Sequence, residues 1–129
     1  MQAKGVGVVD HGGVREFELM GNVMSGLATP SHGAQQLEVW WGKTAPGAAT
    51  PVHRHDAEEI VVVLRGQGEA HAGGAVMPFH APCTLILPKE QLHQLANTGR
   101  ETLEAIAVVP VGSKVFDAEG NEMTLPWRA

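Results

Sequence analysis

The sequence predicts an all-β protein, either a sandwich or a barrel built from about eight to ten short strands. Sixteen glycines and eight prolines interrupt the chain at short intervals. The runs between them are short, apolar and rich in Val, Ile, Thr and Trp, which is typical of strands joined by turns. No segment shows a convincing helical period. At 129 residues the chain can fill one ordinary core, so we expect a single domain over residues 1–129.

Few strands are expected in the N-terminal part of the chain. Residues 6–9 and 14–19 are expected to be short strands on either side of a turn at residues 10–13. Residues 21–33 are rich in Gly, Ser and Pro, so we interpret them as a loop or lid and expect them to be the most mobile segment.

The centre of the chain predicts most of the barrel. Its expected strands cover residues 37–41, 59–64, 69–72, 76–79, 84–87, 92–96 and 103–109. Gly73-Gly74 predicts a tight hairpin turn between two of them. We therefore place the barrel core at about residues 37–110 and expect the tail, residues 110–129, to pack on the barrel surface.

Composition argues against several classes of partner. The formal charge is −5, and the nine basic residues form no run, so neither nucleic acid nor an anionic membrane is an expected partner. No signal-peptide pattern begins the chain and no apolar run approaches the ~18 residues of a membrane span. We expect a cytoplasmic protein. Cys83 is the only cysteine, which excludes an internal disulfide, and we interpret it as a small buried hydrophobe.

Four residues form the pattern that carries chemistry. His53 and His55 are two apart, so on a strand both side chains point to the same side. His55 and Glu59 could share a helical face, but the Thr-Pro before the histidines and the valines after Glu59 favour extended chain. A neighbouring strand could bring His93 to the same place. We predict a metal site of three histidines and one glutamate.

The donor set limits the metal without identifying it. Three imidazoles and a carboxylate suit a divalent Zn, Mn, Fe, Ni, Co or Cu ion, and the set lacks the thiolates of closed structural zinc sites. Four protein ligands leave one or two positions open on a five- or six-coordinate ion, where a small molecule can bind. This opening makes a functional site the preferred interpretation.

Other polar and aromatic residues receive simpler interpretations. Glu58 lies on the opposite strand face from Glu59 and is expected to be solvated or paired with an arginine. Trp40 and Trp41 must point to opposite faces, so we expect one in the core and the other in a pocket or at a dimer interface. The remaining histidines lack partners of this kind and are expected on the surface: His11, His32, His71 and His80.

The histidine stretch resembles the cupin superfamily. The first cupin motif is matched at every position by Gly47, His53, His55, Glu59 and Gly66. The second motif is matched by Pro88, His93 and Asn97, whereas Pro82 and Glu90 stand at its two glycine positions. The resemblance implies a double-stranded β-helix of jelly-roll type, a metal held by the four residues named above, and a homodimer.

A closer resemblance is to the plant auxin-binding proteins, a family of single-domain cupins. It is carried by residues 44–47, 50–55, 58–59, 63–68, 93–94, 97–99 and 114–116. The resemblance implies a metal that takes the carboxylate of a small ligand. Strand direction and this resemblance together give a predicted substrate pocket of Trp40, Trp41, Thr50, Pro51, Val61, Leu95 and Trp127. Val61 stands where the family has a pocket phenylalanine.

Three functions fit these observations. We expect first a metal-dependent enzyme of the oxygenase, isomerase or lyase class, acting on a small substrate that chelates the metal. The alternative is a non-catalytic binder of a small aryl carboxylate through the metal. A third interpretation makes the ion a structural staple. In the first two cases the partner is a small molecule.

Overall fold

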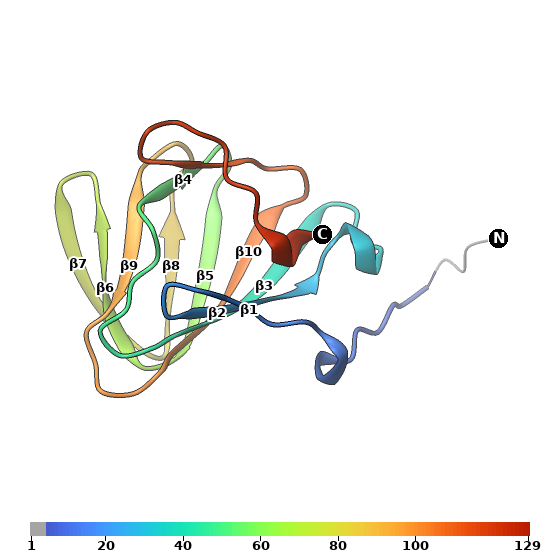
Figure 1. Cartoon of the computed structure of the whole chain (residues 1–129), viewed down its shortest axis with the longest axis horizontal. Coiled ribbons are helices and arrows are strands. Elements are labelled where there is room, and N and C mark those ends of the chain that lie inside the picture. Colours follow the sequence, from blue (N-terminus) through green and yellow to red (C-terminus); the bar gives the residue numbers. More distant parts are fainter. Residues whose placement is uncertain (1–4) are drawn as a thin grey trace.

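Two antiparallel sheets form the walls of the barrel in the computed structural model, which describes residues 5–129 (Figure 1). One sheet has the order β1 (Phe17–Leu19), β2 (Asn22–Ala28), β3 (Leu37–Thr44), β10 (Leu103–Pro110), β5 (Glu59–Arg65) and β8 (Cys83–Leu87). The other has the order β11 (Val115–Asp117), β4 (His53–His55), β9 (His93–Asn97), β6 (Gln67–Ala72) and β7 (Ala75–His80). The prediction of an all-β fold is confirmed.

Helical structure is confined to three short 3-10 turns in the described chain: η1 (His11–Gly13), η2 (Pro30–His32) and η3 (Pro126–Arg128). Among the residues that the structure describes, none of these turns has the length or apolar character of a membrane-crossing helix.

Alternation along the central strands builds the core. On β5, Val61 and Val63 are buried, while Val62 and Leu64 between and after them are exposed on the outer face. The inward residues form one cluster with Leu87 and Leu103. A second cluster lies nearer the C-terminus and contains Trp40, Val109, Val115 and Trp127. The period of two therefore decides which residues fill the barrel.

The hairpin prediction at residues 73–74 is confirmed. Ala72 pairs with Ala75, so Gly73 and Gly74 form a two-residue connection between β6 and β7. Their φ angles are 58° and 78°, and glycine adopts such positive values without the penalty that a side chain imposes.

The N-terminal prediction is wrong in part. Residues 6–9 form no strand, and Val6 and Val8 are 96% and 89% exposed. β-branched residues alone do not make a strand, because a strand needs a partner and an apolar surface to cover. Only Phe17–Leu19 of the predicted strand over residues 14–19 is extended and paired, through β2.

The interpretation of residues 21–33 as a loop or lid is also wrong. β2 (Asn22–Ala28) lies between β1 and β3 and pairs with both. It follows a two-residue turn in which Met20 and Gly21 have φ angles of 54° and 84°. Such turns usually place Asn or Asp first. Because methionine stands there instead, the hairpin carries no recognisable sequence signal.

The tail packs on the barrel and adds a strand that the sequence did not predict. β11 pairs with β4, and the chain then runs past β3 to end beside it (Figure 1). Trp127 is buried in the core. Arg128 fixes this end, since its guanidinium donates to both carboxylate oxygens of buried Glu38 at 3.0 and 2.8 Å and to the Ser113 carbonyl.

A glycine on β2 makes this close packing possible. A Cβ at Gly26 would meet the main-chain carbonyl of Trp127 and lie 2.7 Å from Cγ2 of Thr29. We predict that Gly26→Ala lowers the free energy of unfolding by about 1–3 kcal/mol, the usual cost of overpacking, in urea denaturation.

The matched control is Gly13→Ala, because a Cβ at Gly13 would meet nothing within 4 Å. It should change the free energy of unfolding by less than about 0.5 kcal/mol. Equal effects of the two substitutions would contradict the packing described here.

Candidate metal centre and cavity

Strand pairing brings the four predicted ligands together. On β4, His53 and His55 share one face, and His53 lies directly opposite His93 of β9 in the register. Glu59 begins β5 in the facing sheet. Residues 56–58 form a bend between β4 and β5. After this bend the chain enters the other sheet and begins the valine-rich strand β5.

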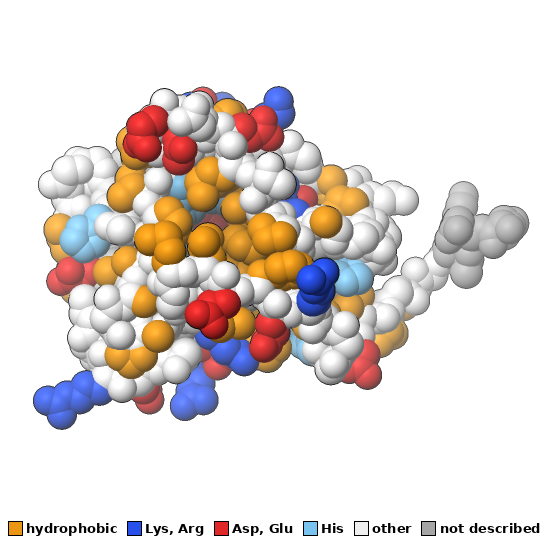
Figure 2. Space-filling view, in the orientation of Figure 1, with side chains coloured by type: hydrophobic (Ala, Val, Ile, Leu, Met, Phe, Trp, Pro, Cys, Tyr) orange, Lys and Arg blue, Asp and Glu red, His pale blue; other side chains and the backbone are white. Residues whose placement is uncertain are grey.

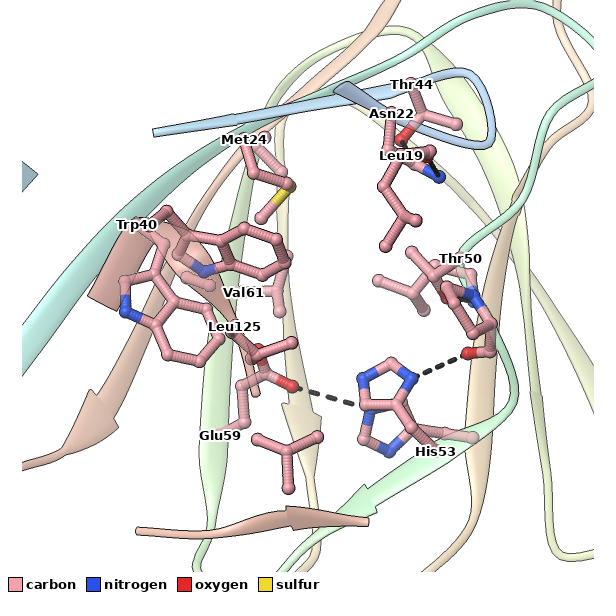
Figure 3. A pocket seen from close by; sticks show the side chains of 18 of the residues that line it. Leu19, Asn22, Met24, Trp40, Thr44, Thr50, His53, Glu59, Val61 and Leu125 are labelled. Atoms are coloured by element: carbon pink, nitrogen blue, oxygen red, sulfur yellow. Dashed lines mark hydrogen bonds and ion pairs between the residues drawn. The ribbon is translucent and has the colours of Figure 1, made fainter. Parts of the chain in front are cut away.

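The ligand atoms form a compact cluster. One nitrogen from each histidine and one oxygen of Glu59 all lie within 4.8 Å of one another. Nε2 of His55 is 3.2 Å from Oε1 of Glu59, and Nε2 of His93 is 3.4 Å from the same oxygen. Figure 3 shows Glu59 and His53 facing each other at one end of a cavity. Atoms in this arrangement can surround a single ion.

Main-chain carbonyls orient two of the rings. Nδ1 of His53 lies 2.6 Å from the Pro51 carbonyl, and Nδ1 of His93 lies 3.2 Å from the Gln91 carbonyl. A carbonyl oxygen can only accept, so each Nδ1 carries the proton and each Nε2 keeps its lone pair for a metal. Nε2 of His93 and both nitrogens of His55 are buried without a hydrogen-bond partner in the described chain.

Burial keeps the imidazoles of His53 and His55 neutral. It lowers the pKa of His55 to about 4, and burial together with nearby His93 lowers the pKa of His53 below its usual 6.5. Burial alone would raise the pKa of Glu59, but His93 and the other two imidazoles outweigh it and the pKa is lowered. At neutral pH His53 and His55 are therefore neutral and Glu59 is a carboxylate, the protonation state in which these groups bind a metal.

These residues fit a divalent transition ion. The set is mixed nitrogen and oxygen, its lone pairs converge, and the buried nitrogens lack other partners. Because neutral imidazole and carboxylate are shared by several metals, the donor set does not choose among Zn, Mn, Fe, Ni, Co and Cu.

A cavity of about 110 Å³ lies beside the cluster, and its wall is mostly apolar. Hydrophobic side chains gather around a hollow in the middle of the face shown in Figure 2, with histidine atoms among them. Six of the predicted pocket residues line the cavity: Trp40, Thr50, Pro51, Val61, Leu95 and Trp127.

Trp41, the seventh predicted pocket residue, does not line this cavity. It follows Trp40 on β3 and points to the opposite face, where its indole N–H donates to Glu104 at 2.7 Å. The ammonium of Lys43 lies 4.3 Å from its ring centre. Trp41 therefore belongs to the outer surface of the sheet.

Part of the wall comes from segments that sequence reasoning did not assign to it. The β1–β2 hairpin contributes Leu19, Asn22 and Met24, and the tail contributes Met123 and Leu125. The sequence did not predict this hairpin, because its turn begins with Met20 where Asn or Asp is usual. The apolar residues at 123, 125 and 127 alternate, and this period of two was the available signal that the tail turns one face inward.

At Glu90, one of the two glycine positions of the second motif, the backbone has a conformation typical of glycine. Glu90 has a φ angle of 66°, in the left-handed region where glycine is favoured. Its amide donates to the His55 carbonyl at 2.7 Å, and its carboxylate pairs with Arg54 at 2.7 Å. These contacts hold the turn that leads into β9 and so place His93.

Comparison with known proteins now assigns the family. The sequence profile described as auxin binding protein matches residues 16–125. The chain belongs to the auxin-binding protein family. The cupin resemblance of the metal-binding motifs is thereby confirmed, together with the fold that it implied.

Individual similarities agree with this assignment. The chain is 40% identical over 100 residues to auxin-binding protein T85 of Nicotiana tabacum, covering 67% of this chain and 54% of that protein. It thus spans about half the length of the curated relatives it matches. A cupin 2 conserved barrel domain protein from Salinispora arenicola shares 28% identity at a TM-score of 0.63, with 92% of each chain covered.

A polyketide cyclase from Streptomyces resistomycificus has the same fold at a TM-score of 0.74, with 98% of this chain and 91% of that chain covered. The sequence identity is 17%, so this likeness concerns the fold alone.

The low pKa of His55 predicts how the metal-free protein responds to acid. In the unfolded chain this histidine gains a proton near pH 6.5, whereas in the fold it does so only near pH 4. The unfolded state therefore binds more protons between these values, and stability falls as pH falls. We expect a loss of up to about 3 kcal/mol from His55, measured by urea denaturation of chelator-treated protein between pH 7 and 4.5.

The matched variant is His55→Gln, which should show a shallower dependence on pH over the same interval. An unfolding free energy of the native sequence that stays constant from pH 7 to 4.5 would show that His55 is not held neutral by burial.

Proposed function

We propose that this protein binds a small aryl carboxylate through a divalent metal ion held by His53, His55, Glu59 and His93. The observation that supports it best is the position of these four residues at one end of a largely apolar cavity. A bound ion would supply positive charge and open coordination positions for the carboxylate. The apolar wall would then cover the ring of the ligand.

The size of the cavity is consistent with one ring. An apolar cavity of about 150 Å³ holds benzene, and the cavity here is of similar size at about 110 Å³. The indole nitrogen of Trp127, a residue of the wall, is buried with no hydrogen-bond partner among residues 5–129. A buried donor of this kind is costly when unsatisfied, and an acceptor on a ligand or its associated water could satisfy it.

The enzyme that we expected first has less support. Catalysis by an oxygenase, isomerase or lyase usually needs a group that moves a proton near the substrate. Among the described residues that line the cavity, Glu59 is the only acid, and lysine, arginine, cysteine and tyrosine do not occur. Since Glu59 and the three histidines are assigned to the metal, the wall offers no separate base. The family relationship also favours binding, because its named members are auxin-binding proteins.

Calorimetry tests the proposed binding. Zinc is the probe metal because it has no redox chemistry of its own, and the ligands are the one-ring acids phenylacetate and benzoate, with acetate for comparison. We expect the aryl acids to bind the zinc-loaded protein at least tenfold tighter than acetate, since burying a ring adds more than about 1.4 kcal/mol. Removal of zinc should abolish binding.

His53→Gln is the matched variant, and it should bind neither zinc nor the acids with the native affinity. Equal binding of the acids with and without zinc would contradict the proposal. Conversion of the acid to a product, detected by chromatography under air, would favour the enzyme.

We also propose a homodimer that forms through the outer face of the six-stranded sheet. Val62, Leu64 and Ile86 lie on this face and are 36%, 48% and 65% exposed. The register places Ile106 opposite Val62, which extends the apolar surface onto β10. A second copy of the same face would cover it with matching apolar surface.

Ile86→Glu should convert the dimer into a monomer in sedimentation velocity, because it would bury a carboxylate without a partner. Val76→Glu is the control: Val76 is 52% exposed on β7 of the other sheet and should leave the dimer intact. A native protein that sediments as a monomer would exclude this arrangement.

A further inference from the structure

The end of the cavity opposite the metal ligands carries a buried polar pair. Asn22 of β2 and Thr44 of β3 are paired residues in the sheet register, so their side chains project from the same face. Both line the cavity, and they are 3% and 9% exposed. Figure 3 shows them at one end and Glu59 with His53 at the other, separated by apolar side chains such as Leu19 and Val61. The cavity therefore has two polar ends.

Hydrogen bonding fixes the orientation of the asparagine. Its Nδ2 lies 3.1 Å from the Leu19 carbonyl and 3.0 Å from the Ala49 carbonyl. Both partners can only accept, so the amide nitrogen must face them and uses both of its protons there. The other atom, Oδ1, therefore faces the hydroxyl of Thr44 at 2.7 Å.

The same reasoning fixes the threonine hydroxyl. Oδ1 of Asn22 carries no proton, so the hydroxyl of Thr44 must donate in this contact. A hydroxyl has one proton and two lone pairs. With the proton given to Asn22, Thr44 Oγ1 retains only acceptor capacity, and neither side chain has a side-chain proton left to donate to a ligand.

We propose that Thr44 selects ligands that carry a hydrogen-bond donor, a ring hydroxyl or ring N–H, at the end opposite the carboxylate. This inference rests on the proposed function, since the metal end fixes the carboxylate and hence the direction of the ring. A ligand that carries only a hydrogen-bond acceptor at this position would face Thr44 Oγ1, which is also an acceptor. Its polar atom would lose its hydrogen bond to water and gain none from the protein. Thr44 is thus a specificity-determining residue, held in the acceptor state by Asn22.

The effect on affinity should equal about one neutral hydrogen bond. Such a bond corresponds to a preference of about three- to tenfold for the donor-bearing ligand over the same ligand without the donor. A ligand in which the donor is methylated should bind more weakly than the unsubstituted ligand, because it adds bulk and an acceptor at an acceptor-only end.

The experiment measures affinities of zinc-loaded protein for four acids by calorimetry: phenylacetate, 3-hydroxyphenylacetate, 4-hydroxyphenylacetate and 4-methoxyphenylacetate. We expect at least one hydroxylated acid to bind three- to tenfold tighter than phenylacetate, and the methyl ether to bind more weakly. Thr44→Ser keeps the hydroxyl and should keep this preference. Thr44→Val replaces the hydroxyl with a methyl group that also covers Asn22. This variant should bring the ratio of the affinities for the hydroxylated acid and phenylacetate close to one.

Zinc content serves as the control, and it should be the same in both variants and the native protein, because the metal ligands lie at the other end of the cavity. A purely structural role of the pair would change stability and leave the ratio unaltered. Equal, zinc-dependent binding of phenylacetate and both hydroxylated acids would overturn this inference while leaving the proposed function intact. Zinc-independent binding, or no binding of any acid, would overturn both.

Discussion

The pairing of β4 with β9 is the contact on which the rest of the site depends, since it places His53 directly opposite His93. This register is reinforced by the segment before β4. The amide of Thr50 donates to the Leu95 carbonyl at 2.9 Å, and the Leu95 amide donates to the hydroxyl of Thr50 at 3.0 Å. A shift by one residue would turn the histidines to opposite faces. The hydrogen bonds of Thr50, in an otherwise irregular segment, therefore hold the imidazole nitrogens of His53 and His93 in place.

The ends of the chain complete what the central strands begin. The barrel strands supply the four candidate metal ligands, but the β1–β2 hairpin and the tail supply much of the cavity wall. Buried Glu38 of β3 ties the tail to the barrel strands, because it accepts from the indole N–H of Trp40 at 3.0 Å and from Arg128 of the tail. The charge-assisted hydrogen bonds from Arg128 and the indole hydrogen bond outweigh burial and lower the pKa of Glu38. Much of the cavity wall is thus built outside the histidine motif.

Sequence predicted the fold and the clustering of the four candidate ligands because both follow from short-range rules. A period of two set the face of His53 and His55, and the spacing to Glu59 was that of a known motif. Asn22 and Thr44 could not be found in this way. Their chemistry depends on two main-chain carbonyls, one of them 27 residues away, and on a hairpin whose turn begins with Met20. The end of the cavity that contains Asn22 and Thr44 is therefore formed by contacts between segments distant in the sequence, which a local pattern does not predict.

We propose that the side chains of His53, His55, Glu59 and His93 together bind one divalent ion. Elemental analysis of protein purified without chelator tests this metal binding most directly. It compares the native sequence with the double variant His53→Ala/His55→Ala and with a surface double variant, His71→Ala/His80→Ala, as the control. We predict about one transition-metal ion per chain in the native protein and the control, and almost none in the first variant. Undiminished metal content after loss of His53 and His55 would show that these residues do not hold the ion.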